Sequence, residues 1–197
     1  MESGIKTGFG KGSGIAARAG GIVNELGRTL SAMNAEDLGK LAGRLLEAEQ
    51  IFVAGAGRSG LMMRAFAMRL MHLGMRAYVV GETVTPGIGS GDLLIVASGS
   101  GETRTVVAMA EKAKKLGAAV ALLTVTPDST LGRLADIVAT IPASAKEQTG
   151  EGAVGVQPMG SLFEQTLLIA CDAIVLEAMD ALNTDASIMF GRHANLE

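Results

Sequence analysis

The chain has 197 residues, of which 17 are basic and 20 acidic, and it carries 27 glycines, five phenylalanines, one tyrosine and no tryptophan. Its formal net charge of −3 gives no basic field for DNA or RNA, and so few aromatic rings offer no platform for base stacking. The low charge and the 48% of hydrophobic residues exclude intrinsic disorder and predict one compact domain.

The apolar segments are too short to cross a bilayer. The longest one, residues 116–127, falls well below the ~18 to 20 residues that a span requires, and residues 1–15 lack an apolar signal core. A single cysteine, Cys171, cannot form an internal disulfide, which fits a reducing compartment. We therefore expect a soluble, cytoplasmic protein with no nucleic-acid and no membrane partner.

Two helices are predicted before the first strand. Residues 1–14 are rich in glycine and are expected to form a flexible tail, which leaves residues 15–197 as a single domain. Over residues 15–33 and again after the capping residue Asn34, apolar side chains recur at helical spacing. The expected apolar faces consist of Ile22, Val23, Leu26 and Leu30 in the first helix, and of Leu38, Leu41, Leu45 and Leu46 in the second.

Short continuous apolar runs then alternate with helical patterns. Runs of this kind are typical of strands buried on both faces of a parallel sheet. The predicted strands are 51–54, 77–80, 93–97, 120–125 and 137–141, and the predicted helices between them are 59–73, 102–116 and 128–134. The alternation predicts an α/β fold in which right-handed βαβ units place helices on both faces of the sheet.

A loop and a long helix complete the predicted fold. Residues 143–158 contain glycine, serine and proline and are expected to form the loop. Residues 160–182 are apolar around most of a helical surface, which favours burial against several neighbours and a subunit interface. Residues 189–197 form a polar segment that we expect to be exposed.

The turn GAGRSG, residues 55–60, follows the first predicted strand and opens a helix. In open α/β sheets, ligands bind beyond the carboxyl ends of strands, where helix N-termini present N–H groups to anions. The turn also fits G-x-G-x-x-G, and Glu82 follows the next strand where a dinucleotide-binding domain carries its ribose-binding acid. Alone, this motif leaves open a phosphate site, a dinucleotide site, or a turn that needs glycine for close packing.

The turn SGSGET, residues 98–103, follows the third predicted strand and opens another helix. It brings the hydroxyls of Ser98, Ser100 and Thr103 to the positive end of that helix. A helix-capping box would need only one of them. Three hydroxyls without a lysine favour a phosphate monoester over a dinucleotide.

The two turns together resemble those of the sugar isomerase (SIS) domain, a phosphosugar-binding fold. From about Ile22 to its C-terminus, the chain is similar more specifically to the 6-phospho-3-hexuloisomerases. The similarity rests on FVAGAGRSGLMMRAFAMRLMHLGM, VVGETVTP, SGSGET, QPMGSLFEQ and the terminal RHANLE. It implies a flavodoxin-like, three-layer α/β/α sandwich with a five-stranded parallel sheet and helical additions at both ends.

The resemblance also implies an activity. Members of this family interconvert D-arabino-3-hexulose 6-phosphate and D-fructose 6-phosphate in the ribulose monophosphate pathway of formaldehyde fixation, after hexulose phosphate synthase. The carbonyl moves from C3 to C2 through an enediolate without net oxidation, so we expect no cofactor and no metal. The family further suggests a homotetramer.

Site residues follow from matching the family's motifs to this chain. Glu164, in GSLFEQ, is the expected catalytic base, enclosed by apolar neighbours; the alternative is a solvated acid in the first turn of a helix. His193, in RHANLE, is expected to move protons between sugar oxygens in its own or a neighbouring subunit's site; the alternative is a tail histidine without a partner. The expected phosphate-binding residues are Ser59, Ser98, Gly99, Ser100, Gly101, Glu102 and Thr103.

Four other reactive side chains receive lesser roles. His72, at a helix end, and Cys171, among apolar residues, are expected to be structural. Glu82 and Thr83 are candidate substrate contacts.

Three competing functions stay open. The first is another aldose–ketose isomerase, of the arabinose 5-phosphate type, whose members commonly carry extra regulatory domains. The second is a non-catalytic phosphosugar sensor, which is ordinarily joined to a DNA-binding module. The third is an NAD-binding module, which the SGSGET turn disfavours.

Overall fold

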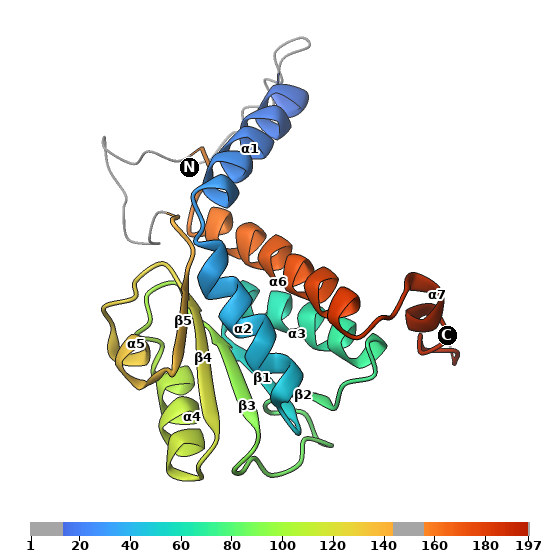
Figure 1. Ribbon diagram of the computed structural model, residues 1–197. Helices are drawn as coiled ribbons and strands as arrows, with labels where there is room; N and C mark the ends of the chain where they lie inside the picture. The colour runs from blue at the N-terminus through green and yellow to red at the C-terminus, as the bar shows by residue number, and fades with distance from the viewer. Residues whose placement is uncertain (1–13, 144–155, 197) are drawn as a thin grey trace, which may run out of the picture.

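A computed structural model describes residues 14–143 and 156–196, and within these ranges a parallel sheet is surrounded by helices (Figure 1). The strands are β1 (Ile51–Gly55), β2 (Ala77–Val79), β3 (Leu93–Ala97), β4 (Ala119–Thr124) and β5 (Ile137–Thr140). The helices are α1 (Gly14–Ser31), α2 (Ala35–Glu47), α3 (Gly57–His72), α4 (Arg104–Lys115), α5 (Thr130–Leu134), α6 (Ser161–Ala181) and α7 (Ala186–Phe190).

The predicted strands and helices are confirmed, with their ends within two residues of the expected positions. One helix, α7, was not predicted, because its five residues are too few to show a periodicity; Asp185 starts it by accepting a hydrogen bond from the Ile188 N–H at 2.9 Å. The predicted tail lies outside the described residues apart from Gly14, and so does most of the predicted loop 143–158.

All five strands run parallel in the order β2-β1-β3-β4-β5. The chain therefore moves outward in one direction from β1 to β2 and in the other from β3 to β5. β1 and β3 are hydrogen-bonded neighbours, with Gly55 opposite Ala97 at their carboxyl ends. In sheets of this order, the point where the winding reverses is where ligands bind.

Alternate residues of the strands feed two separate cores, as the period of two in a strand requires. Val53, Ile95 and Leu123 point to the face that α2, α3 and α6 cover. Phe52 and Leu94 point to the opposite face, which α4 and α5 cover (Figure 1). Because both faces are buried, the strands read as continuous apolar runs, and the expected three-layer α/β/α fold is confirmed.

Helix α1 projects from the body of the molecule next to the start of α6 (Figure 1). Its expected apolar face is confirmed in part: Ile22, Leu26 and Leu30 are half-buried on the side that also buries Glu25 and Thr29, whereas the Val23 side chain is 65% exposed. The buried carboxylate on this face is explained by the segment that α1 contacts, because residues 156 and 157 donate N–H groups to Glu25. A carboxylate, and not an apolar side chain, satisfies such donors.

Asn34 caps α2 as predicted. Its side chain accepts a hydrogen bond from the Glu36 N–H at 3.0 Å, and its amide donates to Asp37 Oδ2 at 3.1 Å. Of the expected apolar face of α2, Leu41 and Leu45 are fully buried and Leu38 is half-buried, whereas Leu46 is 38% exposed.

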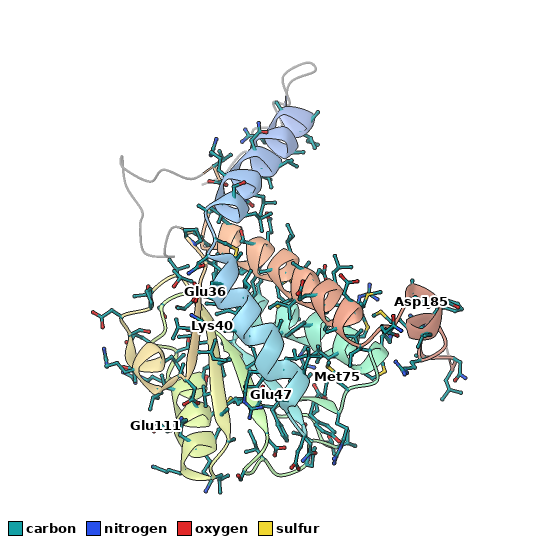
Figure 2. All side chains as sticks on the ribbon, in the orientation of Figure 1. Glu36, Lys40, Glu47, Met75, Glu111 and Asp185 are labelled. Atoms are coloured by element: carbon teal, nitrogen blue, oxygen red, sulfur yellow. The ribbon has the colours of Figure 1, made fainter. Side chains whose placement is uncertain are left out.

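We expect Asn34→Ala to lower the free energy of unfolding by about 1 kcal/mol, because a capping bond is lost. Urea denaturation at a fixed protein concentration measures the change. Lys40→Ala is the matched control: Lys40 pairs with Glu36 at 2.8 Å and with Asp37 at 3.7 Å on the surface of α2, and Figure 2 shows the side chains of Lys40 and Glu36. Surface ion pairs contribute little, so an equal loss in both variants would contradict the role of the cap.

Candidate active site at the carboxyl ends of β1 and β3

The turns 55–60 and 98–103 lie side by side, because they follow the paired carboxyl ends of β1 and β3. Neighbouring strands are about 4.8 Å apart, so one small anion can contact both turns. Each turn leads directly into a helix, α3 or α4, whose first N–H groups have no partner within the helix. The predicted phosphate turns thus converge at the reversal point of the sheet.

The first turn is shaped by close contact between Gly55 and Gly60. A Cβ atom on Gly60 would lie 2.6 Å from the Gly55 carbonyl oxygen, and Gly57 has a φ of +57°. Helix α3 begins at Gly57, two residues earlier than expected, and its capping residue Ala56 offers no side-chain acceptor. Ser59, the expected first residue of this helix, therefore lies within the first turn of α3, where it is buried.

The second turn is held by its own hydroxyl groups. Ser98 Oγ and Thr103 Oγ1 are 2.9 Å apart, and Ser98 Oγ also accepts the Gly101 N–H at 3.2 Å. Ser100 Oγ accepts the Glu102 N–H at 3.2 Å. Thr103 precedes α4 and makes no side-chain capping bond to it. The hydroxyls thus preorganise the turn, and the start of α4 keeps its N–H groups for an anion.

Glu102 faces α5. Its carboxylate accepts a hydrogen bond from the Thr130 N–H at 2.7 Å, and this bond lowers the pKa of Glu102. A carboxylate would repel phosphate, so the side chain is suited to fixing the turn against α5. Any contact of Glu102 with phosphate would have to come from its backbone.

Glu164 lies in the first turn of α6, beside both turns. It is 2% exposed, and its Oε2 atom is 2.8 Å from Nε of Arg58, which belongs to the first turn of α3. The next residue back, Phe163, packs its ring over Gly99 of the second turn, 3.5 Å from where a Cβ would stand. The alternative of a solvated acid is therefore wrong, and the cation of Arg58 compensates the buried negative charge.

The sequence reasoning did not assign a role to Arg58. The sequence feature that could have identified Arg58 is its place as the one charged side chain inside GAGRSG, at the end of a buried strand. The Arg58 side chain pairs with the buried Glu164 and is itself 57% exposed, so it is also accessible from solvent. A group in that position can bind an oxygen of a ligand while it orients the carboxylate.

His193 lies at the other end of the molecule. Its ring stacks on that of His72 with the centroids 5.3 Å apart, and it also faces Phe190. His72 ends α3, whose 16 residues span about 24 Å, while Arg58 and Glu164 lie near the start of that helix. Figure 1 shows α7 and the C-terminus at the far end of α6. The structure therefore does not bring His193 to Glu164 of its own chain.

The C-terminal segment is attached to α3 through His72. Arg192 Nη1 donates a hydrogen bond to the His72 carbonyl at 3.0 Å, and the His72 side chain is buried. The structural role expected for His72 agrees with this position. Burial, then the nearby charge of Arg69, then His193 lower the pKa of His72.

This lowered pKa predicts a pH dependence of stability. An unfolded histidine takes up its proton near pH 6.5, whereas the folded His72 resists protonation. The unfolded state thus binds more protons as the pH falls below that value, so the free energy of unfolding should decrease from pH 7.5 to pH 5.5. Urea denaturation across this range should show a smaller decrease for His72→Gln. Parallel curves for the two proteins would contradict the assignment.

Three remaining reactive side chains are paired, exposed or buried in the fold; they are Glu82, Thr83 and Cys171. Glu82 pairs with Arg64 of α3, and Thr83 is exposed after the end of β2. Cys171 is fully buried in α6, and burial raises the pKa of its thiol, which makes it a poor nucleophile. Among the described residues, no group of three His, Cys, Asp or Glu side chains could hold a metal ion.

A separate hollow of about 500 Å³ lies on the α4 face of the sheet. Phe52, Val80, Ile88, Leu94 and Met109 provide most of its apolar wall. This wall has few groups for a phosphate, and none of the predicted site residues contributes to it.

Among the described helices, none combines the length and the apolar character that crossing a membrane requires.

Comparison with known proteins gives consistent matches. Residues 44–172 match the SIS domain model. The chain is 49% identical to the 3-hexulose-6-phosphate isomerase of Bacillus subtilis, over 89% of this chain and 95% of that protein. It is 46% identical to the 3-hexulose-6-phosphate isomerase of Mycobacterium gastri, over 89% and 88% of the two chains.

A solved structure agrees with these relatives. A Methanococcus jannaschii protein, for which a 3-hexulose-6-phosphate isomerase function has been inferred, superposes with a TM-score of 0.79 at 35% identity. The match covers 92% of this chain and 99% of that one. Similarity in sequence and similarity in fold therefore coincide over most of the chain.

Proposed function

Since the chain belongs to the SIS-domain family, in which its relatives at 46% and 49% identity are 3-hexulose-6-phosphate isomerases, we propose that it interconverts D-arabino-3-hexulose 6-phosphate and D-fructose 6-phosphate. Residues 15–197 would act as a single SIS domain. The observation that carries the chemical proposal is a buried carboxylate, Glu164, beside two turns suited to phosphate.

The phosphate would bind where the turns 55–60 and 98–103 converge. The first N–H groups of α3 and α4 would donate to its oxygens, and the hydroxyls of Ser98, Ser100 and Thr103 would complete the contact. Binding energy from this remote group would fix the sugar relative to Glu164, so that proton transfer occurs within one oriented complex.

Glu164 would take the proton from C2 of the 3-ketose. The C2–H electron pair then forms the C2–C3 double bond and the C3 carbonyl electrons move onto O3, which gives an enediolate that afterwards takes up a proton on O3. Return of a proton to C3 and loss of the O2 proton leave the carbonyl at C2, so atoms and electrons balance without an external oxidant or reductant. Arg58, 2.8 Å from Glu164, would stabilise the negative charge that develops on the enediolate oxygens.

His193 would act in the site of a neighbouring subunit. Within one chain it is about one helix length from Arg58, so a second copy has to supply it if it handles the sugar oxygens. The exposed Ile169 and Leu176 on α6 support a contact between copies along that helix. A homotetramer, as the family suggests, would provide such contacts.

Mixing two inactive variants tests this arrangement. We expect Glu164→Gln and His193→Ala each to be nearly inactive alone. After an equimolar mixture is dissociated and reassociated at random as pairs, about half of the pairs are hybrids, and one of the two sites in each hybrid has both residues. The mixture should therefore recover about a quarter of wild-type activity. The coupled assay described below measures the recovery. No recovery, although native mass spectrometry detects hybrids, would place His193 outside the partner's site.

The cellular role follows from the substrate. The enzyme would act in the cytoplasm after hexulose phosphate synthase, which makes the 3-ketose from ribulose 5-phosphate and formaldehyde. The dinucleotide alternative is not supported, because Glu82 is paired with Arg64. A sensor without catalysis would not need a buried carboxylate at the phosphate turns.

A coupled assay tests the activity itself. Hexulose 6-phosphate is generated in place from ribulose 5-phosphate and formaldehyde, and fructose 6-phosphate is followed through downstream enzymes. We expect rapid turnover of this substrate and little turnover of arabinose 5-phosphate. The reverse preference, shown by a folded oligomer, would replace the proposal with the arabinose 5-phosphate alternative.

A further inference from the structure

The QPMG sequence before α6 forms a strained turn. The Ser161 N–H donates to the Pro158 carbonyl at 3.1 Å, and the two residues between them, Met159 and Gly160, have φ values of +55° and +77°. Two successive positive φ values define a type I′ turn, which a non-glycine residue such as Met159 rarely adopts. Gly160 is also the residue from which α6, and therefore Glu164, begins.

Glu25 of α1 holds the chain just before this turn. Its Oε1 accepts the Val156 N–H at 2.9 Å, and its Oε2 accepts the Gln157 side-chain N–H at 3.1 Å. Glu25 is only 4% exposed, although carboxylates are rarely buried unless they are paired with a donor or a cation. The contacts connect segments more than a hundred residues apart in the sequence.

Residues 157–160, a segment with little backbone freedom, join these contacts to α6. Gln157 is anchored on Glu25, Pro158 has a fixed φ, and the next two residues form the left-handed turn that ends at α6. The Glu164 N–H then donates to the Gly160 carbonyl at 3.2 Å, in the first turn of the helix. Strained backbone of this kind persists only when its surroundings fix it.

We propose that Glu25 is a positioning residue for Glu164: it fixes the entry to α6, and thereby places the carboxylate against Arg58 and the sugar. This inference rests on the proposed role of Glu164 as the base. It also explains why α1 buries a carboxylate beside the half-buried apolar side chains of the same face.

Steady-state kinetics of three variants in the coupled assay test the proposal. Glu25→Ala removes both acceptors, and we expect kcat to fall by about tenfold to a hundredfold with a smaller change in KM, since small displacements of a catalytic group have effects of this size. Glu25→Gln should retain most of the activity, because an amide can accept from Val156 and exchange a hydrogen bond with a reoriented Gln157 amide. Asn24→Ala, at the neighbouring exposed position of α1, should be unchanged.

A double variant separates positioning from general destabilisation. If Glu25 acts through Glu164, adding Glu25→Ala to Glu164→Gln should lower the residual kcat by less than twofold. An equal fall in kcat when Glu25→Ala is introduced into the wild type and into Glu164→Gln would overturn the proposal for Glu25. A wild-type kcat for Glu25→Ala, while Glu164→Gln is impaired, would overturn it as well. If Glu164→Gln itself keeps full activity, the base assignment fails instead, and the two failures are thus distinguished.

Discussion

The Glu164→Gln variant is expected to lose about 10²- to 10⁴-fold in kcat, which is the usual contribution of a general base. Glutamine keeps the size of the side chain in its buried position at the start of α6, but it has no basic carboxylate to remove the C2 proton. Glu164 contacts the first turn through the Arg58 side chain, and the backbone N–H groups expected to bind phosphate keep their positions, so binding of fructose 6-phosphate should change by only a few-fold. The coupled assay measures kcat, and calorimetry measures binding.

The matched control is Glu177→Gln, which makes the same substitution at an exposed position of α6. It should turn over substrate at the wild-type rate. A Glu164→Gln enzyme with unchanged kcat, together with intact fructose 6-phosphate binding, would remove Glu164 from the mechanism and leave the phosphate site in place.

Gly101→Ala is expected to have the second largest effect, because the glycine has no room for a side chain. Its φ is +66°, and an added Cβ would lie 2.0 Å from Ser129 Oγ and 2.5 Å from Ser129 Cβ. Ser129 cannot move aside cheaply, since it is buried and caps α5 through the Gly132 N–H. Left-handed strain and overpacking together should lower the free energy of unfolding by about 2–4 kcal/mol.

The same substitution should displace the second phosphate turn. We expect KM for the phosphosugar to rise at least about tenfold, since the turn can no longer present its donors in one geometry. Gly43→Ala is the control: this glycine lies on the exposed side of α2, and nothing stands within 4 Å of its added Cβ. Equal KM values for the two variants would show that the turn does not bind the phosphate.

The fold could be predicted from local patterns because both faces of the sheet are buried. Strands such as β3 then read as uninterrupted apolar runs, and Asn34 marks the start of α2. The burial of Glu25 in α1 could not be predicted in this way, because it depends on the N–H donors of residues 156 and 157 far along the chain. The short helix α7 also escaped, since its capping residue Asp185 is a signal common to many turns.

The position of the turns 55–60 and 98–103 at strand-to-helix junctions could be predicted, because each combines glycines and hydroxyls after an apolar run, and their binding of phosphate stays a prediction. Their adjacency depends on the pairing of β1 with β3, which no local pattern encodes. The contact between Arg58 and Glu164 depends on the packing of α3 against α6 and was missed for the same reason. His193 was expected near a site, but its stacking on His72 could not be read from the sequence.

Deuterium exchange tests the central claim most directly, namely that Glu164 drives isomerisation through an enediolate. Fructose 6-phosphate is incubated with the enzyme in D₂O for many turnovers, and C3 is then examined by NMR. The mechanism predicts that the wild-type enzyme replaces the C3 proton with deuterium and that Glu164→Gln does so slower by the same factor as its kcat. Deuterium incorporation at C3 by Glu164→Gln at the wild-type rate would contradict proton abstraction by this carboxylate.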